Sequence, residues 1–363
     1  MIVNLSLSIR IAINAEALNM AEAVGNYTRH RKAPVVIASD GGYSIIYVPA
    51  VSGESLAYSY QAILARITKD RNLPVTKMDE LGYFLKFADD NVLGWYEEDL
   101  KRVIGENSVQ EWIGKASVSE IERAILKASV VADVGGFLYT SKQVKRTSAI
   151  RFSYMLPTID TIEKGGVAVT PQLHVRYAPP EPRERARDAQ KLFYLESGSA
   201  LYTFTAQLTA SNISKLYYSD KDDDELKNQK SKRVEVAVDA LIALVDGALF
   251  GARRSRYQPQ WDVKSLVVAV SKGPIEFIVS PGLTRDYINK TYSRAVSLCK
   301  AIQEESIDIY VFNGEGLEEP STVQKTEEEA ASAKVTYDNK IASHTEALVK
   351  AKSEILSIIK DLQ

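Results

Sequence analysis

A regular alternation of apolar and polar side chains at the start of the chain constrains the fold most strongly. Apolar residues occupy every second position from Val3 to Ile13, and the positions between them are mostly polar, including Ser6 and Arg10. A period of two places the apolar set on one face of a β-strand and the polar set on the opposite face. We therefore expect a long strand that buries one face and leaves the other face polar.

Other local patterns place further elements in the first 75 residues. β-branched runs at 34–37 and 43–48 flank Asp40-Gly41-Gly42, which is typical of a β-hairpin. Ser52 is a good N-cap, and apolar residues follow it at helical spacing until about Pro74. The loop expected over 15–32 is longer than a simple connector, and loops of this size tend to carry function.

The rest of the chain predicts an α+β fold with two insertions. The stretch 75–130 predicts a helical insertion, and the Pro-, Gly- and Arg-rich stretch 157–190 predicts an extended, mobile arm. A tight turn is expected at 133–137 and a charged loop at 220–232. The other expected elements are strands at 149–156, 200–208, 265–270 and 307–312 and helices at 233–249 and 287–302.

The C-terminal stretch 321–363 differs in composition, because it is rich in Ala, Glu, Lys and Ser. Its apolar residues fall on a seven-residue spacing, with two more set three residues further on, which predicts an amphipathic helix. The residues of this seam are Ile341, Leu348, Ala351, Ile355, Ile358 and Leu362. The helix either folds back on its own core or contacts a partner.

The counts of reactive residues exclude several classes of protein. One cysteine excludes a disulfide framework and a Cys-rich metal site, and three widely separated histidines argue against a His-ligated metal. No metal and no cofactor are therefore expected. The start of the chain lacks the features of a signal peptide, and the most apolar stretch, 234–250, contains three carboxylates. We expect a cytoplasmic protein without a membrane partner.

No convincing catalytic set is present, so no enzymatic activity is expected. The sequence lacks the G-x-x-x-x-G-K-S/T motif of phosphate-binding loops, the H-E-x-x-H motif of zinc proteases and the G-x-S-x-G motif of serine hydrolases. Cys299 lies in a helical pattern and is expected to be a core thiol. Gly135-Gly136 lacks the third glycine of a nucleotide fingerprint, so a backbone turn is the simpler interpretation.

Clusters of basic residues beside aromatic residues are the feature that points to a ligand. Arginine forks fit phosphate oxygens, and aromatic faces stack on unpaired bases for about 1–3 kcal/mol per base. One such cluster is usually a solvated surface, but four clusters in loops favour RNA. The clusters are Tyr27 to Lys32; Lys142, Lys145, Arg146 and Arg151; His174 and Arg176 followed by Arg183, Arg185, Arg187 and Lys191; and Arg253, Arg254 and Arg256.

The net charge of −2 hides this basic character. Residues 304–363 carry 13 acidic and 6 basic side chains, so the preceding residues carry a net charge of +5. Because the average covers unlike parts, the net charge says nothing about the partner.

Several blocks of sequence, in order over roughly residues 1–315, are similar to those of a known family. The chain resembles the archaeal type I-A CRISPR backbone subunit, the repeat-copy subunit of the Cascade-like complex (Csa/DevR autoregulator family). The matching blocks are 14–19 (NAEALN), 25–35 (GNYTRHRKAPV), 48–58 (VPAVSGESLAY), 133–139 (DVGGFLY), 146–150 (RTSAI), 154–157 (YMLP), 172–176 (QLHVR), 199–204 (SALYTF) and 254–256 (RSR). The C-terminal helix has no match in the family pattern.

The resemblance implies a modified RRM-like (ferredoxin-like) palm formed by 1–75, 131–156 and 195–315. The insertion 76–130 would be finger-like, the arm 157–194 thumb-like, and 321–363 a C-terminal amphipathic helix. Copies would assemble head to tail along one CRISPR RNA and present the guide for pairing with target DNA. Implied partners are thus CRISPR RNA, target DNA through the guide, other copies and other CRISPR subunits, and cleavage would belong to those other subunits.

The resemblance also implies which residues bind RNA. Ser52 and Gly53 would present backbone N–H groups of a helix N-terminus to a phosphate, and Arg146 would contact backbone near the glycine turn. His174 would contact a displaced nucleotide, or would be a turn-stabilising side chain instead. The full set is Asn19, Asn26, Tyr27, Thr28, Arg29, His30, Arg31, Ser52, Gly53, Glu54, Ser55, Tyr58, Gly135, Gly136, Lys145, Arg146, His174, Arg176, Arg253, Arg254 and Arg256.

Two alternatives come from other functional classes. One is a metal-independent RRM-like endoribonuclease that processes CRISPR RNA, with Tyr27, His30 and Lys32 as its acid and base groups. The other is a transcriptional regulator, since the wider family has carried that label. A regulator of this kind would need specificity for double-stranded DNA, and the sequence contains no helix-turn-helix pattern.

Overall fold

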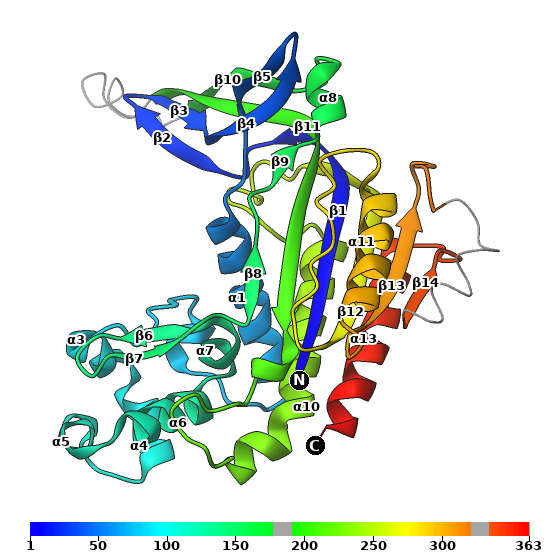
Figure 1. Cartoon of the computed structure of the whole chain (residues 1–363). Helices are drawn as coiled ribbons and strands as arrows, with labels where there is room; N and C mark the ends of the chain where they lie inside the picture. The colour runs from blue at the N-terminus through cyan, green and yellow to red at the C-terminus, as the bar shows by residue number, and fades with distance from the viewer. Residues whose placement is uncertain (177–190, 321–333, 363) are drawn as a thin grey trace, which may run out of the picture.

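The computed structural model describes residues 1–176, 191–320 and 334–362 (Figure 1). A central mixed sheet is built around β1 (Ile2–Glu16), which pairs antiparallel with β11 (Lys191–Thr209) on one side and β12 (Gln260–Gly273) on the other. The sheet order is β14-β13-β12-β1-β11-β3-β2. Its outer strands are β2 (Met20–Val24), β3 (Tyr27–His30), β13 (Ser306–Asn313) and β14 (Val335–Asp338). The short strands β8 (Ile150–Phe152) and β9 (Leu156–Pro157) also pair with β11.

The polar face of β1 is buried as completely as its apolar face. Asn4, Ser6, Ser8 and Arg10 have no exposed surface, because the segment that follows β12 crosses them. Asn4 Nδ2 donates to the carbonyl of Phe277 at 2.7 Å, and further bonds join Ser6 and Ser8 to the same segment. The expected strand is therefore confirmed, but its polar face is a hydrogen-bonding surface inside the protein.

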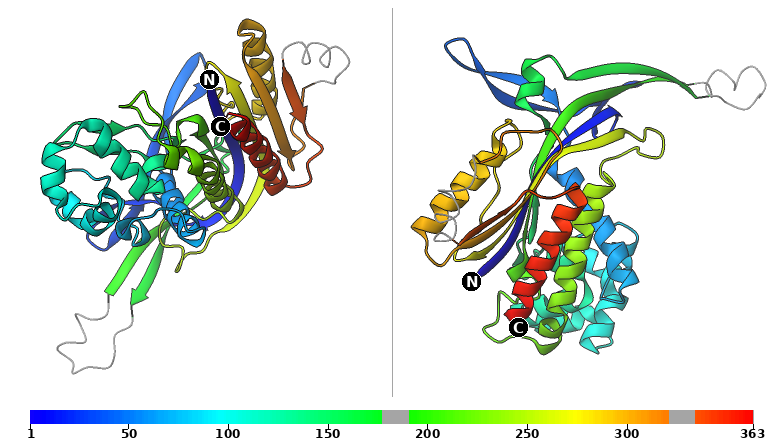
Figure 2. Two further views of the ribbon diagram at one scale, coloured as in Figure 1. Left: turned by 90° about the horizontal axis from the view of Figure 1, so that it is seen from below. Right: turned by 90° about the vertical axis from the view of Figure 1, so that its right-hand side faces the viewer.

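Helices cover both faces of the sheet (Figure 2). The helices α1 (Gly53–Asp70), α10 (Asp224–Asp246) and α13 (His344–Asp361) contribute to one apolar core with the odd-numbered residues of β1. On the opposite face, α11 (Tyr287–Ala301) packs against β12 and β13. Cys299 of α11 is buried there, as expected for a core thiol, and burial raises the pKa of its thiol to about 11.

The N-cap of α1 is confirmed, whereas the start of α10 differs from the prediction. The Ser52 side chain accepts a hydrogen bond from the backbone N–H of Ser55. Residues 224–232 were expected in a charged loop but form the first turns of α10. Asp223 caps this helix by accepting from the backbone N–H groups of Glu225 and Leu226. A local cap thus extends the helix through a mostly polar, exposed stretch.

The expected helical insertion is present and has a core of its own. Most of its apolar side chains pack together with β6 and β7 rather than with the main sheet. The buried exceptions are Val130, Val131 and Val134 of α7, which belong to the main core. The elements are α2 (Lys77–Glu80), α3 (Asp90–Leu93), the 3-10 turn η1 (Gly94–Tyr96), α4 (Glu97–Ile104), α5 (Val109–Lys115), α6 (Val118–Ala128), α7 (Val130–Gly135), β6 (Phe137–Tyr139) and β7 (Val144–Arg146). The expected turn at 133–137 is the end of α7 followed by Gly136, whose φ is +71°.

An arm extends from the end of the sheet farthest from the chain termini (Figure 1). It consists of β10 (Ala168–Arg176) paired with the first part of β11, after the short helix α8 (Ile159–Glu163). The loop expected over 15–32 is instead mostly the β2–β3 hairpin, whose largely exposed residues lack the alternation that predicts strands. Arg183, Arg185 and Arg187 of the expected arm lie outside the described residues.

The C-terminal helix folds back on the chain's own core, so the first of the two alternatives is confirmed. It begins at His344 rather than near 321, after β14, and residues 321–333 lie outside the described residues. Leu348, Ala351 and Ile355 are buried against α10, β12 and β1. Leu362, the last residue of the expected seam, is exposed.

We expect Ile355→Ala to reduce the free energy of unfolding by about 2–5 kcal/mol, because it leaves a cavity under α13. Val349→Ala on the exposed side of the same helix should change it by less than about 0.5 kcal/mol. Urea denaturation of the two variants measures the difference. Equal losses would contradict the packing of α13 on the core.

Candidate nucleic-acid interface

Segments that the sequence assigned to RNA binding converge at the base of the arm. The loop after α10 lies against the start of the β2–β3 hairpin, since the backbone N–H of Ala252 donates to the Leu18 carbonyl at 2.8 Å. The same loop reaches α1, where the N–H of Gly251 donates to the Ser59 hydroxyl at 3.3 Å. Gly251 has a φ of +81°, and a Cβ there would lie 2.6 Å from that of Leu18, so the close approach requires glycine.

A chain of hydrogen bonds connects the hairpin to the N-terminus of α1. Asn19 Nδ2 donates to the Ser52 hydroxyl at 3.3 Å, and Arg31 Nε donates to Asn19 Oδ1 at 3.0 Å. Asn19 and Ser52 are buried, whereas Arg31 is half-buried. Gly53 lies so close to β8 that a Cβ would be 2.5 Å from the Phe152 carbonyl oxygen. The buried members therefore position the helix end and Arg31.

The outward side of α1 carries exposed groups beyond this buried base. Glu54 and Tyr58 are exposed, and Ser55 is half-buried. The Tyr58 ring meets the Phe84 ring edge-on, with centroids 5.4 Å apart. Tyr58 therefore offers an aromatic surface to a ligand.

The β2–β3 hairpin presents a cation beside an aromatic ring. Asn26 and Arg29 are exposed, Tyr27 and Thr28 are half-buried, and the Arg29 guanidinium lies 5.5 Å from the Tyr27 ring centroid. The Tyr27 hydroxyl donates to Glu196 of β11 at 2.6 Å, and this bond raises the pKa of Tyr27. Asn26 is tied to the arm as well, through its side chain to the Leu192 carbonyl.

His30 is not part of this surface, so its predicted contact with RNA is wrong. Its side chain is fully buried, with Nε2 2.6 Å from Glu16 Oε1 and Nδ1 2.9 Å from the Arg31 carbonyl oxygen. Burial opposes the charge of the imidazole, but the Glu16 carboxylate outweighs burial and raises the pKa of His30. The endoribonuclease alternative needs this side chain at the surface, where it does not lie.

His174 fastens the arm to the loop after α10. Its ring stacks on Phe193 of β11 with centroids 5.3 Å apart and meets Tyr257 edge-on at 5.2 Å. Its buried Nε2 has no hydrogen-bond partner among the described residues. The packing agrees with the structural alternative for His174, and its contact with RNA stays a prediction. Arg176 ends β10, and its side chain is outside what the structure describes.

The arginines of the loop after α10 lie beside this aromatic cluster. Arg253 and Arg256 are exposed, and Arg254 is half-buried. Burial lowers the pKa of the Arg254 guanidinium, whose buried Nε finds no acceptor in the described part of the chain. A phosphate oxygen would supply such an acceptor.

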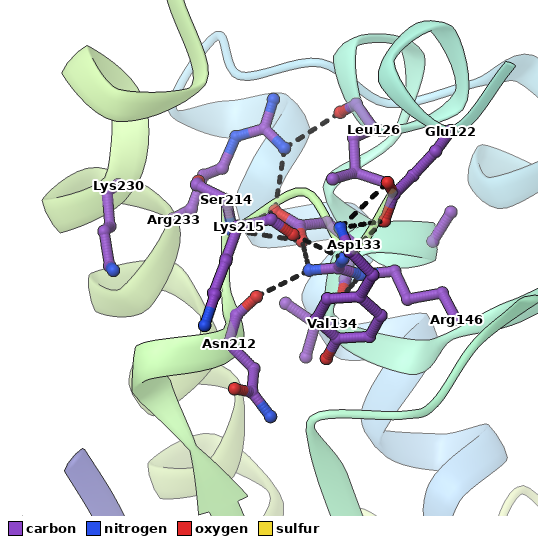
Figure 3. A network of polar contacts seen from close by, with 12 residues as sticks. Glu122, Leu126, Asp133, Val134, Arg146, Asn212, Ser214, Lys215, Lys230 and Arg233 are labelled. Atoms are coloured by element: carbon purple, nitrogen blue, oxygen red, sulfur yellow. Dashed lines mark hydrogen bonds and ion pairs between the residues drawn. The ribbon is translucent and has the colours of Figure 1, made fainter. Parts of the chain in front are cut away.

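Arg146 does not contact solvent, which makes its predicted role in RNA binding wrong. Its guanidinium is fully buried between Asp133 of α7, at 2.5 Å, and Glu122 of α6, at 3.3 Å (Figure 3). It also donates to the backbone carbonyls of Asn212 and Lys215. Every polar atom of the side chain is thus used inside the protein.

The network around Arg146 contains two carboxylates and two guanidiniums. Arg233 of α10 donates to Asp133 Oδ2 at 2.9 Å and to the Leu126 carbonyl. The carboxylates also accept backbone N–H groups of the segment after η2 (Ala210–Asn212), namely Ser214 at Asp133 and Tyr217 and Tyr218 at Glu122. Arg146, Asp133, Glu122 and Arg233 therefore balance in charge and join the insertion to the main core.

The glycine pair and Lys145 lie along the insertion rather than at the base of the arm. The Gly135 carbonyl accepts from the Lys86 ammonium at 2.9 Å, and burial lowers the pKa of Lys86 to about 8. A Cβ on Gly136 would lie 2.5 Å from the Arg146 carbonyl oxygen, so this glycine serves close packing. Lys145 is exposed on β7.

Some residues that hold the interface were missed from the sequence. Glu16 and Glu196 anchor His30 and Tyr27, and Phe193 supports His174. Glu16 follows a reversal of the backbone at Ala15, whose φ is +53°, and no local pattern predicts it. Within the described residues, no group of three or more potential ligands could hold a metal ion, and no helix is long and apolar enough to cross a membrane.

Comparison with known proteins identifies the family. The model of the family "CRISPR-associated negative auto-regulator DevR/Csa2" matches residues 7–292. This chain belongs to that family. It is 37% identical over 331 residues to "CRISPR-associated aCascade subunit Cas7/Csa2 2" of Saccharolobus solfataricus, covering 90% of this chain and 97% of the relative. It is 34% identical to "CRISPR-associated protein Cas7/Csa2 1" of the same organism, covering 82% and 88%.

We expect Arg146→Ala to destabilise this DevR/Csa2 chain by about 3–5 kcal/mol, because Glu122 and Asp133 are left buried with less compensating charge. The neighbouring Lys145→Ala should have little effect, since its side chain is exposed. Urea denaturation measures both. A stable Arg146→Ala protein with weakened RNA binding would restore the original prediction.

The Glu16–His30 pair predicts a dependence of stability on pH. The pKa of His30 is raised, so its contribution is complete below about 6.5 and is lost as pH rises through its folded-state pKa. Hydrogen bonds from His30, Leu18 and Tyr202 outweigh burial and lower the pKa of Glu16, whose contribution is lost as pH falls through its own folded-state pKa.

We therefore expect the stability lost in His30→Gln to be largest between about pH 4.5 and 6.5 and to shrink at higher pH. Denaturation of the wild type and of His30→Gln, from about pH 4.5 to above the folded-state pKa of His30, measures the difference. Glu16→Gln should remove the same pH dependence, and a constant difference at all pH values would refute the pairing.

Proposed function

We propose that this chain is the CRISPR RNA-binding backbone subunit of a type I-A antiviral interference complex. Its relative in Saccharolobus solfataricus is named an aCascade subunit, and the match covers 90% of this chain and 97% of the relative. Several copies assemble along one CRISPR RNA, together with other subunits, and present the guide for pairing with target DNA.

The observation that carries this proposal is the convergence at the base of the arm. The β2–β3 hairpin, the start of α1, the arm and the loop after α10 meet there through named contacts. Arg29, Arg253 and Arg256 are exposed at this place, beside the rings of Tyr27 and Tyr257. Cations and aromatic rings of this kind suit a single strand whose phosphates and base faces are both accessible.

We propose that the central sheet with α1 and α10 is a modified RRM-like palm. In this assignment the palm comprises 1–75, 131–156 and 195–315, with a finger-like insertion at 76–130 and a thumb-like arm at 157–194. The separate core supports a finger-like insertion, although this core also includes β6 and β7 from 131–156. The projection of β10 and β11 beyond the sheet supports a thumb-like arm (Figure 1).

The protein grips the guide without reading its sequence. Arginine side chains contact phosphates, which are the same at every nucleotide, so binding is tolerant of sequence. The base edges stay free, and Watson–Crick pairing supplies the specificity.

We propose that the subunit does not cleave RNA. The burial of His30 in an ion pair with Glu16 supports this proposal, because a general acid or base must reach the ribose hydroxyl or the leaving oxygen. Incubation with labelled repeat RNA in the absence of metal tests it. Specific cleavage that is lost in His30→Ala would establish the endoribonuclease instead.

We expect the double variant Arg254→Gln, Arg256→Gln to weaken RNA binding equally for unrelated guide sequences. Loss of two phosphate contacts should lower the slope of log K against log salt by about 1.4 for a single strand. Fluorescence anisotropy over a salt series measures both quantities.

Lys360→Gln provides the matched control, since Lys360 is an exposed cation at the end of α13, far from the arm (Figure 1). It should leave both affinity and slope unchanged. A sequence-selective loss in the double variant would contradict a phosphate role for the two arginines.

A further inference from the structure

The hairpin of β4 (Lys32–Ser39) and β5 (Gly42–Pro49) presents an uncovered apolar face. The two strands pair only with each other among the described strands, at the end of the molecule away from the termini (Figure 1). Directly opposed residues point to the same side, so one face carries the pairs Pro34–Tyr47, Val36–Ile45 and Ala38–Tyr43. Val36, Tyr43, Ile45 and Tyr47 are 57%, 82%, 64% and 70% exposed.

The opposite face of the hairpin is anchored at its base. Ala33, Val35 and Val48 alternate with the exposed residues and are buried. The register is therefore fixed, because a slip by one residue would exchange the buried and exposed sets. The exposed apolar residues of the hairpin therefore occupy fixed positions on the surface.

The chemistry of this face fits a protein partner. Lys32, the first residue of β4, is the one cation of the hairpin and lies at the base of its exposed face. From Ala33 to Gly53 the only charged residue is Asp40 in the turn, so the apolar pairs themselves present no cation to a phosphate. Exposed Tyr and Ile without charge resemble the centre of a protein interface. Two tyrosines with Ile45 and Val36 supply on the order of 500 Å² of apolar surface, a patch size that usually marks an interaction site.

The position of the hairpin identifies the partner. β4 begins at Lys32, directly after the β2–β3 hairpin that carries Arg29 and Arg31 of the RNA surface. Copies bound side by side on one strand must meet through surfaces next to the strand. A repeating contact of this kind buries a face of every copy except a terminal one.

We propose that the outer face of the β4–β5 hairpin docks a second copy of this chain, bound next to it on the same RNA. This inference rests on the proposed function, because the RNA sets the two copies side by side. Without the neighbouring copy the apolar ladder stays exposed to water.

The test compares two sets of substitutions at exposed apolar residues. The hairpin variant carries Tyr43→Ser, Ile45→Thr and Tyr47→Ser, and the control carries Trp95→Ser and Val349→Thr, which are exposed elsewhere. Sedimentation velocity and anisotropy are measured on an RNA that fits one copy and on an RNA that fits several.

The hairpin variant should bind the short RNA as the wild type does. On the long RNA its cooperativity should fall by at least about tenfold, because docking tyrosines are typical hot spots. The control should match the wild type on both RNAs. Unchanged cooperativity in the hairpin variant would overturn the proposal.

A photo-crosslinker at position 47 identifies the occupant directly. With Tyr47→benzoylphenylalanine in the protein assembled on the long RNA, a crosslink to another copy supports the proposal. A crosslink only to RNA or to a different protein, or none, refutes it.

A failure of the proposed function would look different from a failure of docking. If the wild type does not bind the short RNA, the proposed function fails by itself. The same crosslinking at high protein concentration without RNA then decides the docking: copy-to-copy crosslinks support it, and their absence overturns it.

Discussion

A charge-balanced cluster without exposed side-chain surface holds the helical insertion to α10 and to the segment that precedes it. Asp133, Glu122 and Arg146 come from the insertion, on α7, α6 and β7, and Arg233 lies on α10. Charges buried in this way cost several kcal/mol each in lost hydration unless they are paired and fully hydrogen-bonded. The same carboxylates also hold backbone N–H groups of the segment before α10, so removing one member affects three parts of the chain. The network therefore fixes where the insertion lies.

Buried carboxylates with hydrogen-bonding partners also hold the backbone at the base of the arm. Glu16 accepts from the Tyr202 hydroxyl and pairs with His30, and Glu196 holds Tyr27. These side chains contact other parts of the protein rather than a ligand. They fix the backbone so that Arg29 and Arg31, which flank His30, reach the surface in a defined orientation. Rigid placement of cations lowers the entropy lost when a nucleic acid binds.

Local chemistry explains which parts of this structure could be predicted from the sequence. The cap at Ser52 and the alternation in β1 are decided by neighbouring residues, and both predictions hold. The burial of Asn4 is decided by Phe277, and that of Arg146 by Glu122 and Asp133, which no local pattern reveals. Arginine next to aromatic residues looks the same in sequence whether it faces RNA or a buried carboxylate. His30 was misjudged for this reason too, whereas the exposed arginines near Tyr257 were identified as surface groups.

The burial of β1 on both faces has a consequence for the order in which the chain acquires its structure. During synthesis β1 emerges before β11 and β12, and Asn4 must wait for Phe277, 273 residues later. Contacts of such separation are slow to form, and an unpaired apolar strand is prone to aggregate until they do. The segment that forms β1 is therefore the part of the new chain that most needs protection by chaperones. The helical insertion, in contrast, has mostly local contacts in a core of its own and can fold early.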